Sequence, residues 1–394
     1  YLPPEFWKQR EYFFYEGMEL KIGPAYRKYG EATIYSEATE KFHTQAQIGR
    51  DGGLIGYVAG LPFPGEIDCA GDPQAGLKLV WNFMKQWDGD GSTSSYFYSY
   101  WDRGEQLPLY YEGTAKSIIL SNRPEPHYLT QDGDIFKNEK RLTAFGIEVD
   151  APFDARGIML MTYRYKVSDG PLDKGKNDDT WVYVPDLRRV RRISSAQRTD
   201  AVAGTDFTFD DLRSFSGIPP QYEWSCIGEQ DVVAPVNTKV WAYPYEEEHN
   251  FGPYGLSYAD DQWELRDAWI IRFKPKNEDH PYSSKSIWID KETYIPLYSF
   301  AYDRKGELWK IIWHNHRYSE DWRENDPRTK GGDWYKGWES VEKPNDLRVI
   351  SDMIINVQTG TGNRIEFWDS HGSPFKSKGK IRRYIDIGRL NKGR

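Results

Sequence analysis

The chain has 394 residues and a mass of 46.0 kDa, and its 52 basic and 60 acidic side chains give a net charge of −8 at pH 7. No apolar run approaches the roughly 18 residues that a membrane-spanning helix needs, which excludes an integral membrane protein of that kind. The negative charge argues against a dedicated nucleic-acid binder. Although mean hydropathy is −0.78, Phe, Trp and Tyr make up 16% of the residues, so the chain can build a substantial core.

The first thirty residues differ in character from the rest. They begin Tyr-Leu-Pro-Pro with neither an initiator Met nor an apolar leader, which fits a removed signal peptide or a trimmed sequence. We expect residues 1–30 to form an arm that packs on one domain covering 31–394. The two cysteines, Cys69 and Cys226, could form a disulfide in an exported protein, or be two unrelated buried thiols.

One amphipathic helix is predicted in the first quarter of the chain. Asp72 is a suitable N-cap and Pro73 a suitable first residue. An apolar stripe then runs to Trp87, and glycines at 89 and 91 end the helix. Because the stripe is broad, this helix must cover another part of the protein.

Most of the remaining sequence predicts antiparallel strands, because side chains alternate with a period of two. Several of these strands are apolar on both faces, so the sheet must be covered on both sides or wrap around an apolar cavity. A polar segment at about 319–346 reads as a long surface excursion. The predicted strands are 32–35, 42–48, 96–101, 158–165, 180–184, 268–273, a hairpin of 297–302 and 308–313, 347–358, 364–368 and 383–387.

Candidate catalytic and metal-binding residues are weakly supported. His314 and His316 share one strand face and could bind a metal, but no third ligand is recognisable, so polar positions near a strand end are favoured. The carboxylates of 205–211 lack the spacing of a calcium loop or a glycosidase, and we interpret them as a strand followed by a cap. No nucleophile-and-base motif is present, so we predict no catalytic residue, no metal and no cofactor.

The densest basic run consists of Arg188, Arg189, Arg191 and Arg192. In a chain of negative charge, a solvated turn followed by an edge strand is the default interpretation. A surface that contacts a partner or a phosphate headgroup is the alternative.

Several longer phrases together resemble one protein family. They are GLPFP at 60–64, DPQAGLKLVWN at 72–82, TWVYVPDLRRVRRI at 180–193, GTDFTFDDL at 204–212, IWID at 287–290, YIPL at 294–297 and YDRKG at 302–306. This combination resembles the DUF1329 family of exported bacterial proteins, which is similar to outer-membrane lipoprotein-sorting proteins of the LolA and LolB type. The resemblance extends from about Arg10 to Arg383.

The resemblance implies a mainly β (α+β) fold. It would be a strongly curved antiparallel sheet forming an unclosed half barrel, with helices plugging the concave face. It further implies a periplasmic protein of the Gram-negative envelope that carries a lipid or another hydrophobic molecule. An RND-family inner-membrane transporter and an outer-membrane β-barrel protein are the implied partners. The family offers no catalytic residues to transfer to this chain.

Two functions from different classes follow. The first is a carrier whose cargo lies in an apolar cavity under the helix of 73–87. The second is a non-catalytic docking subunit of an envelope transport complex that uses the basic run, and a hydrolase is a weaker third. The side chains predicted to line the cavity are Leu77, Trp81, Met84, Trp181, Tyr183, Trp269, Ile271, Phe300 and Trp309.

Overall fold

The computed structural model describes residues 1–23, 29–87, 89–102, 107–124, 135–136, 140–167, 177–194, 198–238, 262–319, 345–372 and 377–392. Most of the predicted excursion at 319–346 lies outside these ranges. Its two ends meet, because the backbone N–H of Ser319 donates to the carbonyl of Asp346 at 2.8 Å.

In the described part of the chain, fourteen strands form one large sheet in the order β1-β11-β12-β13-β14-β15-β16-β4-β5-β6-β7-β8-β9, with β10 paired to β11. A separate pair, β2 (Gln47–Ile48) and β3 (Leu54–Ile55), lies apart from it. The strands of the large sheet are β1 (Lys21–Ile22), β4 (Ser92–Trp101), β5 (Leu109–Ile119), β6 (Arg141–Ala151), β7 (Met159–Tyr165), β8 (Asp179–Val184), β9 (Arg189–Ile193), β10 (Tyr222–Asn237), β11 (Gln262–Pro275), β12 (Ser284–Asp290), β13 (Pro296–Tyr302), β14 (Leu308–Tyr318), β15 (Leu347–Asn356) and β16 (Thr361–Gly372).

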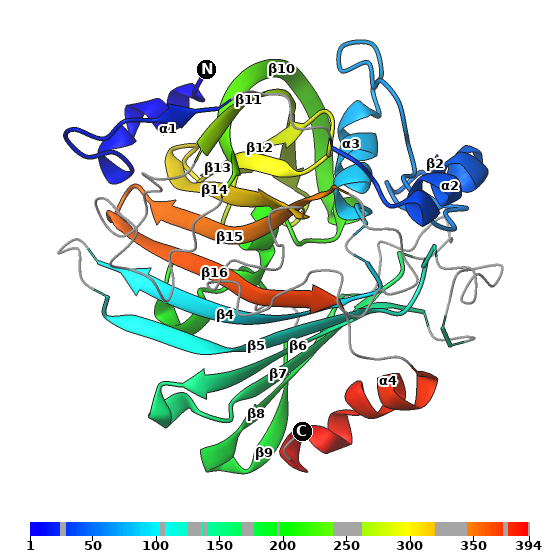
Figure 1. Cartoon of the computed structure of the whole chain (residues 1–394), viewed down its shortest axis with the longest axis vertical. Coiled ribbons are helices and arrows are strands. Elements are labelled where there is room, and N and C mark those ends of the chain that lie inside the picture. The colour runs from blue at the N-terminus through cyan, green and yellow to red at the C-terminus, as the bar shows by residue number, and fades with distance from the viewer. Residues whose placement is uncertain are drawn as a thin grey trace.

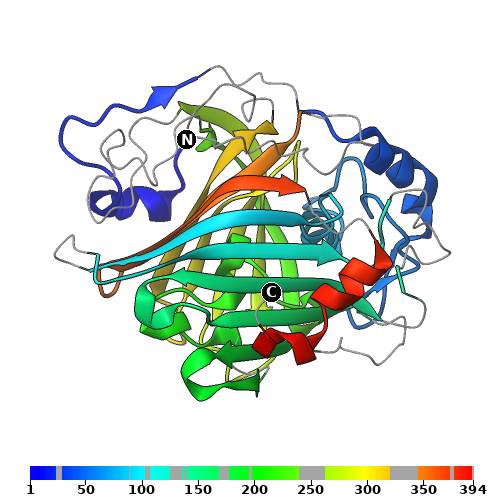
Figure 2. The same ribbon diagram turned by 60° about the horizontal axis from the view of Figure 1, so that its bottom comes forward.

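The sheet is strongly curved and does not close into a barrel. Strands β4 to β9 pass across one side of the molecule and β10 to β13 lie on the other, joined through β14 to β16 (Figures 1 and 2). All neighbouring strands are antiparallel except β1, whose two residues pair parallel with β11. The predicted curved, unclosed sheet is therefore confirmed, and the sheet is mixed rather than purely antiparallel.

Both faces of the sheet carry apolar side chains, as the two-faced strands predicted. On β12, for example, Ile287 and Ile289 belong to one core cluster and Trp288, between them, to another. The outer face of β12 to β15 is covered by the N-terminal segment, which contains α1 (Pro4–Lys8) and the 3-10 helix η1 (Arg10–Tyr12). There the ring of Phe13 contacts that of Trp313, with centroids 4.5 Å apart.

The outer face of β5 to β8 is covered by the C-terminal helices α4 (Lys378–Tyr384) and η13 (Ile387–Lys392) (Figure 2). The prediction of a strand at 383–387 is therefore wrong. Ile381, Tyr384 and Ile385 are spaced as one face of a helix, and all three are buried against the sheet. Ser377 caps α4, since its Oγ accepts from the N–H of Lys380 at 3.3 Å.

The inner face of β10 to β13 is covered by α3 (Ala75–Met84), and α2 (Thr33–Phe42) lies on the other side of α3 (Figure 1). From α2, Tyr35 reaches the core between α3 and the sheet. The strand predicted at 32–35 and the start of the one at 42–48 are wrong, because Tyr35 and Ala38 bury one helical face of α2. The predicted helix exists, but it begins three residues after Asp72, whose Oδ1 instead accepts from the N–H of Gln74 at 2.8 Å.

Helix α3 lies very close to β10. A Cβ atom placed on Gly76 would come within 2.7 Å of the backbone of Ser225, so a side chain at this position would push the helix away from the strand. The remaining 3-10 helices of the described residues are η2 (His43–Gln45), η3 (Phe153–Ala155), η4 (Pro185–Leu187), η6 (Val202–Gly204), η7 (Phe209–Ser214) and η8 (Pro219–Gln221). No described helix combines the length and the apolar character needed to cross a membrane.

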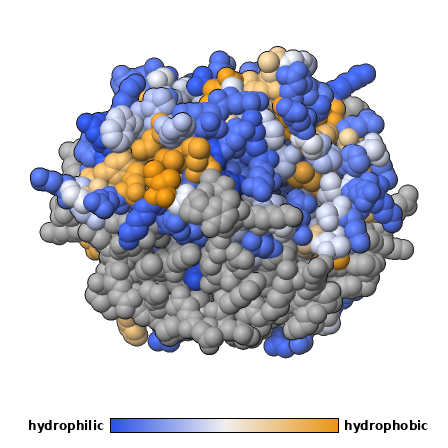
Figure 3. Space-filling model, turned by 45° about the horizontal axis from the view of Figure 1, so that its top comes forward, coloured by the Kyte–Doolittle hydropathy of each residue, from blue (hydrophilic) through white to orange (hydrophobic). Residues whose placement is uncertain are grey.

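The described part of the surface turned forward in Figure 3 is mostly hydrophilic, and its largest apolar area lies at the left of the view. Few large apolar side chains of the described residues are exposed, as expected when both faces of the sheet are covered. They are Tyr1, Trp7, Ile22, Phe153, Leu187, Ile227 and Leu265.

The structure joins Cys69 and Cys226 in a disulfide, which the sequence had left open. Their Cα atoms are 5.2 Å apart and the residues are separated by 157 positions. The bridge ties the segment that precedes α3 to strand β10, so it fixes this helix to the inner face of the sheet.

We predict that reduction of this bridge lowers the free energy of unfolding by about 5 kcal/mol, because it closes a long loop in the unfolded chain. Thermal unfolding with and without a reductant measures the effect. The double variant Cys69→Ser/Cys226→Ser is the control, since its lower midpoint should not respond to the reductant. Equal stability of the oxidised and reduced protein would contradict this prediction.

Candidate functional site

Residues 198–221, which we call the plug, cross the inner face of the sheet between its two halves. The plug contains η6, η7 and η8, and its turn has non-helical backbone at Leu212 and a left-handed φ of +52° at Arg213. The prediction of a strand followed by a cap at 205–211 is wrong. Residues 205–208 belong to no strand and residues 209–214 form η7. The aromatic side chains pack against the sheet instead of pairing with it, as Phe207 does on Tyr98 of β4 with ring centroids 5.9 Å apart.

Asp211 is the most completely buried of these carboxylates. It is fully buried, and its oxygens lie 2.8 Å from Nζ of Lys285 on β12 and 3.2 Å from Nζ of Lys310 on β14. The hydroxyl of Tyr282 donates to Asp211 at 2.8 Å, and that of Thr208 at 2.9 Å. Burial alone would raise the pKa of Asp211, but the two lysines outweigh it and hold the pKa below its usual range.

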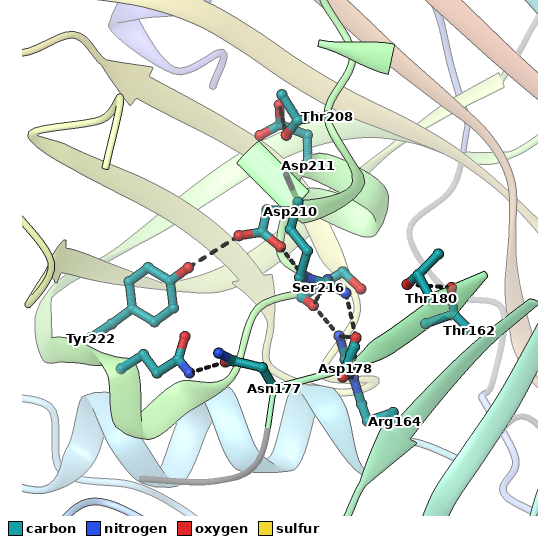
Figure 4. A network of polar contacts seen from close by, with 12 residues as sticks. Thr162, Arg164, Asn177, Asp178, Thr180, Thr208, Asp210, Asp211, Ser216 and Tyr222 are labelled. Atoms are coloured by element: carbon teal, nitrogen blue, oxygen red, sulfur yellow. Dashed lines mark hydrogen bonds and ion pairs between the residues drawn. The ribbon is translucent and has the colours of Figure 1, made fainter. Parts of the chain in front are cut away.

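A second ion-pair network holds the other end of the plug against β7 and β8 (Figure 4). Nε of Arg198 donates to Asp210 at 2.7 Å, and its guanidinium also pairs with Asp178. Asp178 pairs with Arg164 on β7 at 3.0 Å. The hydroxyl of Tyr222 donates to Asp210 at 3.2 Å. These contacts connect the plug to both halves of the curved sheet.

A third contact group is a buried Ser-His-Asp arrangement that the sequence did not reveal. Oγ of Ser214 lies 2.6 Å from Nε2 of His314, and Nδ1 of His314 lies 2.6 Å from Oδ1 of Asp352. The order of groups is that of a nucleophile, a base and an orienting acid. All three residues are fully buried, however, and none of them lines a cavity described below. The arrangement therefore fastens the plug to β14 and β15.

The plug does not fill the inner face of β4 to β8, where an apolar cavity of about 270 Å³ remains. We call it the apolar chamber. Its walls come from one face of five strands and of β16, and the plug contributes three large side chains, Phe207, Phe209 and Leu212. The lining residues are Tyr96, Tyr98, Tyr111, Ala115, Phe145, Ile147, Val149, Ile158, Leu160, Val182, Val202, Ala203, Phe207, Phe209, Leu212, Ile365 and Phe367.

Three further cavities adjoin the apolar chamber and also share Leu212 with it. One of about 240 Å³, the cationic chamber, is lined by Lys85, Arg164 and Arg213 together with hydroxyl, amide and apolar groups. Another of about 300 Å³ is lined by Arg213, Arg348 and several serines. The smallest, about 140 Å³, borders Asp178 and Arg198. The plug turn at Leu212 thus lies at the junction of all four spaces.

Of the side chains predicted from α3, Met84 lines the cationic chamber and the other two lie elsewhere. Trp81 is buried on the far side of the helix, where its Nε1 donates to the carbonyl of Gly52 at 2.9 Å. Leu77 is half-buried and also lies next to Gly52.

The side chains predicted from strands occupy three places, and none lines a cavity described above. Trp181 and Tyr183 face the C-terminal helices on the outer side. Phe300 is covered by the N-terminal segment. The remaining three belong to the filled core between α3 and the inner face; they are Trp269, Ile271 and Trp309.

Alternation along a strand shows which side chains share a face, but not which face is concave. On β8, Val182 lines the apolar chamber while its neighbours Trp181 and Tyr183 point outward. Phe207, Phe209 and Leu212 of the phrase GTDFTFDDL at 204–212 also line the chamber, which neither the alternation nor the resemblance had indicated.

The basic run forms the predicted turn and edge strand. Arg188 follows η4, and β9 has one strand neighbour, β8, among the described residues. Arg188, Arg189 and Arg191 are exposed, and Arg192 pairs with Asp179.

His314 and His316 both lie fully buried on β14, with ring centroids 6.1 Å apart. His314 is bound by Ser214 and Asp352 as described above. Within the described ranges, no group of three or more His, Cys, Asp or Glu side chains has the geometry of a metal site.

Comparison with known proteins identifies the family. Residues 9–374 match the family described as "Protein of unknown function (DUF1329)", so the chain belongs to the DUF1329 family. An uncharacterized protein of Pseudomonas aeruginosa, PA3922, is 24% identical over 298 residues, which cover 73% of this chain and 61% of that relative. This match leaves more than a third of the relative's length uncovered.

Two crystal structures share the fold at low sequence identity. A DUF1329 family protein from Desulfovibrio piger is 19% identical with a TM-score of 0.53, covering 81% of this chain and 99% of that one. A putative outer membrane lipoprotein-sorting protein domain from Vibrio parahaemolyticus is 17% identical with a TM-score of 0.51, covering 81% and 100%.

We predict that Asp211→Asn destabilises the fold by about 3–5 kcal/mol, because it leaves two buried lysines without their carboxylate. Denaturant unfolding at pH 7 measures the loss, with the exposed Asp154→Asn as the matched control. Folding lowers the pKa of Asp211, so its ion pairs stabilise fully above the unfolded value of about 3.9 and are lost as pH falls. The difference in the free energy of unfolding between Asp211→Asn and the unmodified protein should therefore stay constant from pH 5 to 7. It should become smaller at lower pH. A variant as stable as the control would contradict the assigned role.

Proposed function

We propose that this DUF1329 protein is a non-catalytic carrier whose cargo places its hydrophobic part in the apolar chamber. The observation that carries the proposal is the asymmetry of the inner face. Helix α3 fills it along β10 to β13, whereas along β4 to β8 a space of about 270 Å³ with almost wholly apolar walls remains. Ligand cavities of proteins have this concave, apolar character.

The energetics suit a carrier. A ligand that buries about 400 Å² of apolar surface gains roughly 10 kcal/mol at about 25 cal/mol per Å². The loss of translational freedom and the ordering of side chains reduce this gain substantially. The remaining affinity would hold the cargo during transport and still allow its release.

No chemistry is assigned to the site. The Ser214–His314–Asp352 arrangement is the nearest approach to catalytic machinery among the described residues, yet its serine faces the strands instead of a cavity. A substrate bound in the apolar chamber would meet side chains of Phe, Ile, Leu, Val, Ala and Tyr.

The proposed location is the periplasm of a Gram-negative envelope, after removal of a signal peptide. The Cys69–Cys226 bridge supports an oxidising compartment. The fold shared with a lipoprotein-sorting domain supports a lipid or similarly hydrophobic cargo. An RND-family transporter and an outer-membrane β-barrel protein are the partners proposed for loading and delivery.

A docking role is the second candidate, supported by the exposed arginines of β9 and of the turn before it. Arg188, Arg189 and Arg191 project from a sheet edge with a single strand neighbour among the described residues. Such an edge presents positive charge to a partner. The two roles are compatible, because this edge contributes no residue to the apolar chamber.

We predict that filling the apolar chamber abolishes uptake of a neutral apolar probe. Val182→Trp and Ala115→Trp each place a large ring in that space and should weaken binding of N-phenyl-1-naphthylamine at least about tenfold, as measured by fluorescence titration. Leu187→Trp, at an exposed position, is the control and should bind as the unmodified protein does. Unchanged binding by folded filling variants would contradict the assignment of the chamber.

We predict that Arg188→Glu/Arg189→Glu/Arg191→Glu disrupts capture of envelope partners while leaving probe uptake unchanged. Reversal of charge replaces attraction by repulsion at the contact. A pull-down with candidate RND and outer-membrane proteins measures the first effect, and the fluorescence titration the second. If the triple variant still captured the envelope partners, this edge could not be the docking surface.

A further inference from the structure

The cavity of about 300 Å³ differs from the apolar chamber in the polarity of its walls. We call it the hydroxyl chamber, because side chains with hydroxyl groups reach it from four neighbouring strands. They are Ser92 and Ser94 on β4, Ser117 on β5, Thr143 on β6 and Ser370 on β16. The described lining of the apolar chamber, in contrast, contains no serine or threonine.

The inner face of these strands changes from polar to apolar along its length. On β4, Ser94 lines the hydroxyl chamber, and Tyr96, the next residue on the same face, lines the apolar chamber. On β6, Thr143 lines the hydroxyl chamber and Ile147, further along the same face, lines the apolar chamber. The two kinds of wall are thus built by the same strands.

The two chambers lie directly next to each other. Ala115, Phe145, Leu212 and Phe367 line both of them, and these side chains come from β5, β6, the plug and β16. A ligand whose two parts differ in polarity could therefore place one part in each chamber.

The four serines form two pairs that retain hydrogen-bonding capacity. The hydroxyl of Ser370 donates to Oγ of Ser94 at 2.8 Å, and Oγ of Ser92 lies 3.0 Å from that of Ser117. One hydrogen bond between two hydroxyl groups uses one of their two protons, so each pair keeps one O–H that can donate. An oxygen atom of a ligand can accept from it, whereas a hydrocarbon chain cannot.

The two arginines of the hydroxyl chamber already bind other side chains. Arg348 pairs with Asp346, and the guanidinium of Arg213 donates to Oε1 of Gln86 at 3.1 Å. A charged head group would have to leave water for a site whose cations have partners of their own, which is costly. An uncharged head group loses less on entering.

We infer that the cargo is an uncharged amphiphile whose head group carries hydroxyl or ester oxygens. The head group binds to the serine pairs of the hydroxyl chamber while the hydrophobic part occupies the apolar chamber. This inference rests on the proposed carrier function and narrows its cargo.

The test uses ligands that share a twelve-carbon chain and differ in the head group: 1-monolaurin, methyl laurate, laurate and dodecylamine. Displacement of N-phenyl-1-naphthylamine from the whole protein at pH 7 measures their affinities. We expect 1-monolaurin to bind at least about tenfold more tightly than methyl laurate, which has the same ester but lacks the two hydroxyl groups. It should also bind more tightly than laurate and dodecylamine.

Variants assign the preference to the serines. Ser92→Ala/Ser94→Ala/Ser117→Ala/Ser370→Ala should bring the ratio of the 1-monolaurin and methyl laurate affinities close to one without weakening methyl laurate. Removal of one pair alone, in Ser94→Ala/Ser370→Ala, should lower the ratio part of the way. Ser94→Thr/Ser117→Thr keeps both hydroxyl groups and should preserve it. Ser95→Ala is the matched control, since Ser95 lies on the opposite face of β4.

The outcomes separate the inference from the function on which it rests. Equal affinities for 1-monolaurin and methyl laurate would overturn the hydroxylated head group, and tighter binding of laurate or dodecylamine would overturn the uncharged one. A ratio that persists in the alanine variants would overturn the assignment to the serine pairs. Failure of all four ligands to displace the probe would instead count against the carrier function.

Discussion

The carboxylate of Asp211 holds the plug against the inner face of the sheet, and the shape of the cavities depends on this attachment. Two lysines, from β12 and β14, lie 2.8 and 3.2 Å from its oxygens, so the plug is fixed to this part of the sheet. The Arg198 network and the Ser214–His314–Asp352 contacts fasten the segment on either side of it. Moving the plug away would leave buried charges of the sheet without their partners, which is costly. These ion pairs therefore keep the plug in place. The plug is therefore a fixed wall rather than a loose cover.

The two halves of the inner face of the sheet are covered unequally, and this difference leaves the space proposed to hold a ligand. The N- and C-terminal segments cover the outer face of the sheet, and α3 covers half of its inner face. The other inner half meets the plug at Phe207, Phe209 and Leu212, and a space with apolar walls is left between them. Water in such a space would find almost no hydrogen-bond partners, so a hydrophobic ligand is the more favourable occupant.

Much of the fold could be predicted from the sequence, but the site could not. Period-two alternation located most strands, and the family resemblance implied the curved, unclosed sheet. Alternation does not reveal which face is concave, however, so Trp181 was predicted to line the cavity although its neighbour Val182 does so. The aromatic alternation of 205–211 imitates a strand, whereas its conformation is determined by ion pairs with residues about 70 to 100 positions away. Such distant pairs leave no local pattern, and for the same reason the Ser214–His314–Asp352 contacts were not foreseen.

The central claim is that a bound chain lies inside the apolar chamber, and a crystal structure with 12-bromododecanoate tests it most directly. The anomalous signal of bromine marks the end of the chain without reference to any prior assignment. We expect bromine among Phe145, Ile147 and Phe207, between the plug and strands β4 to β8. Bromine bound at the protein surface, or a chamber closed by its own side chains while the ligand is held elsewhere, would contradict it.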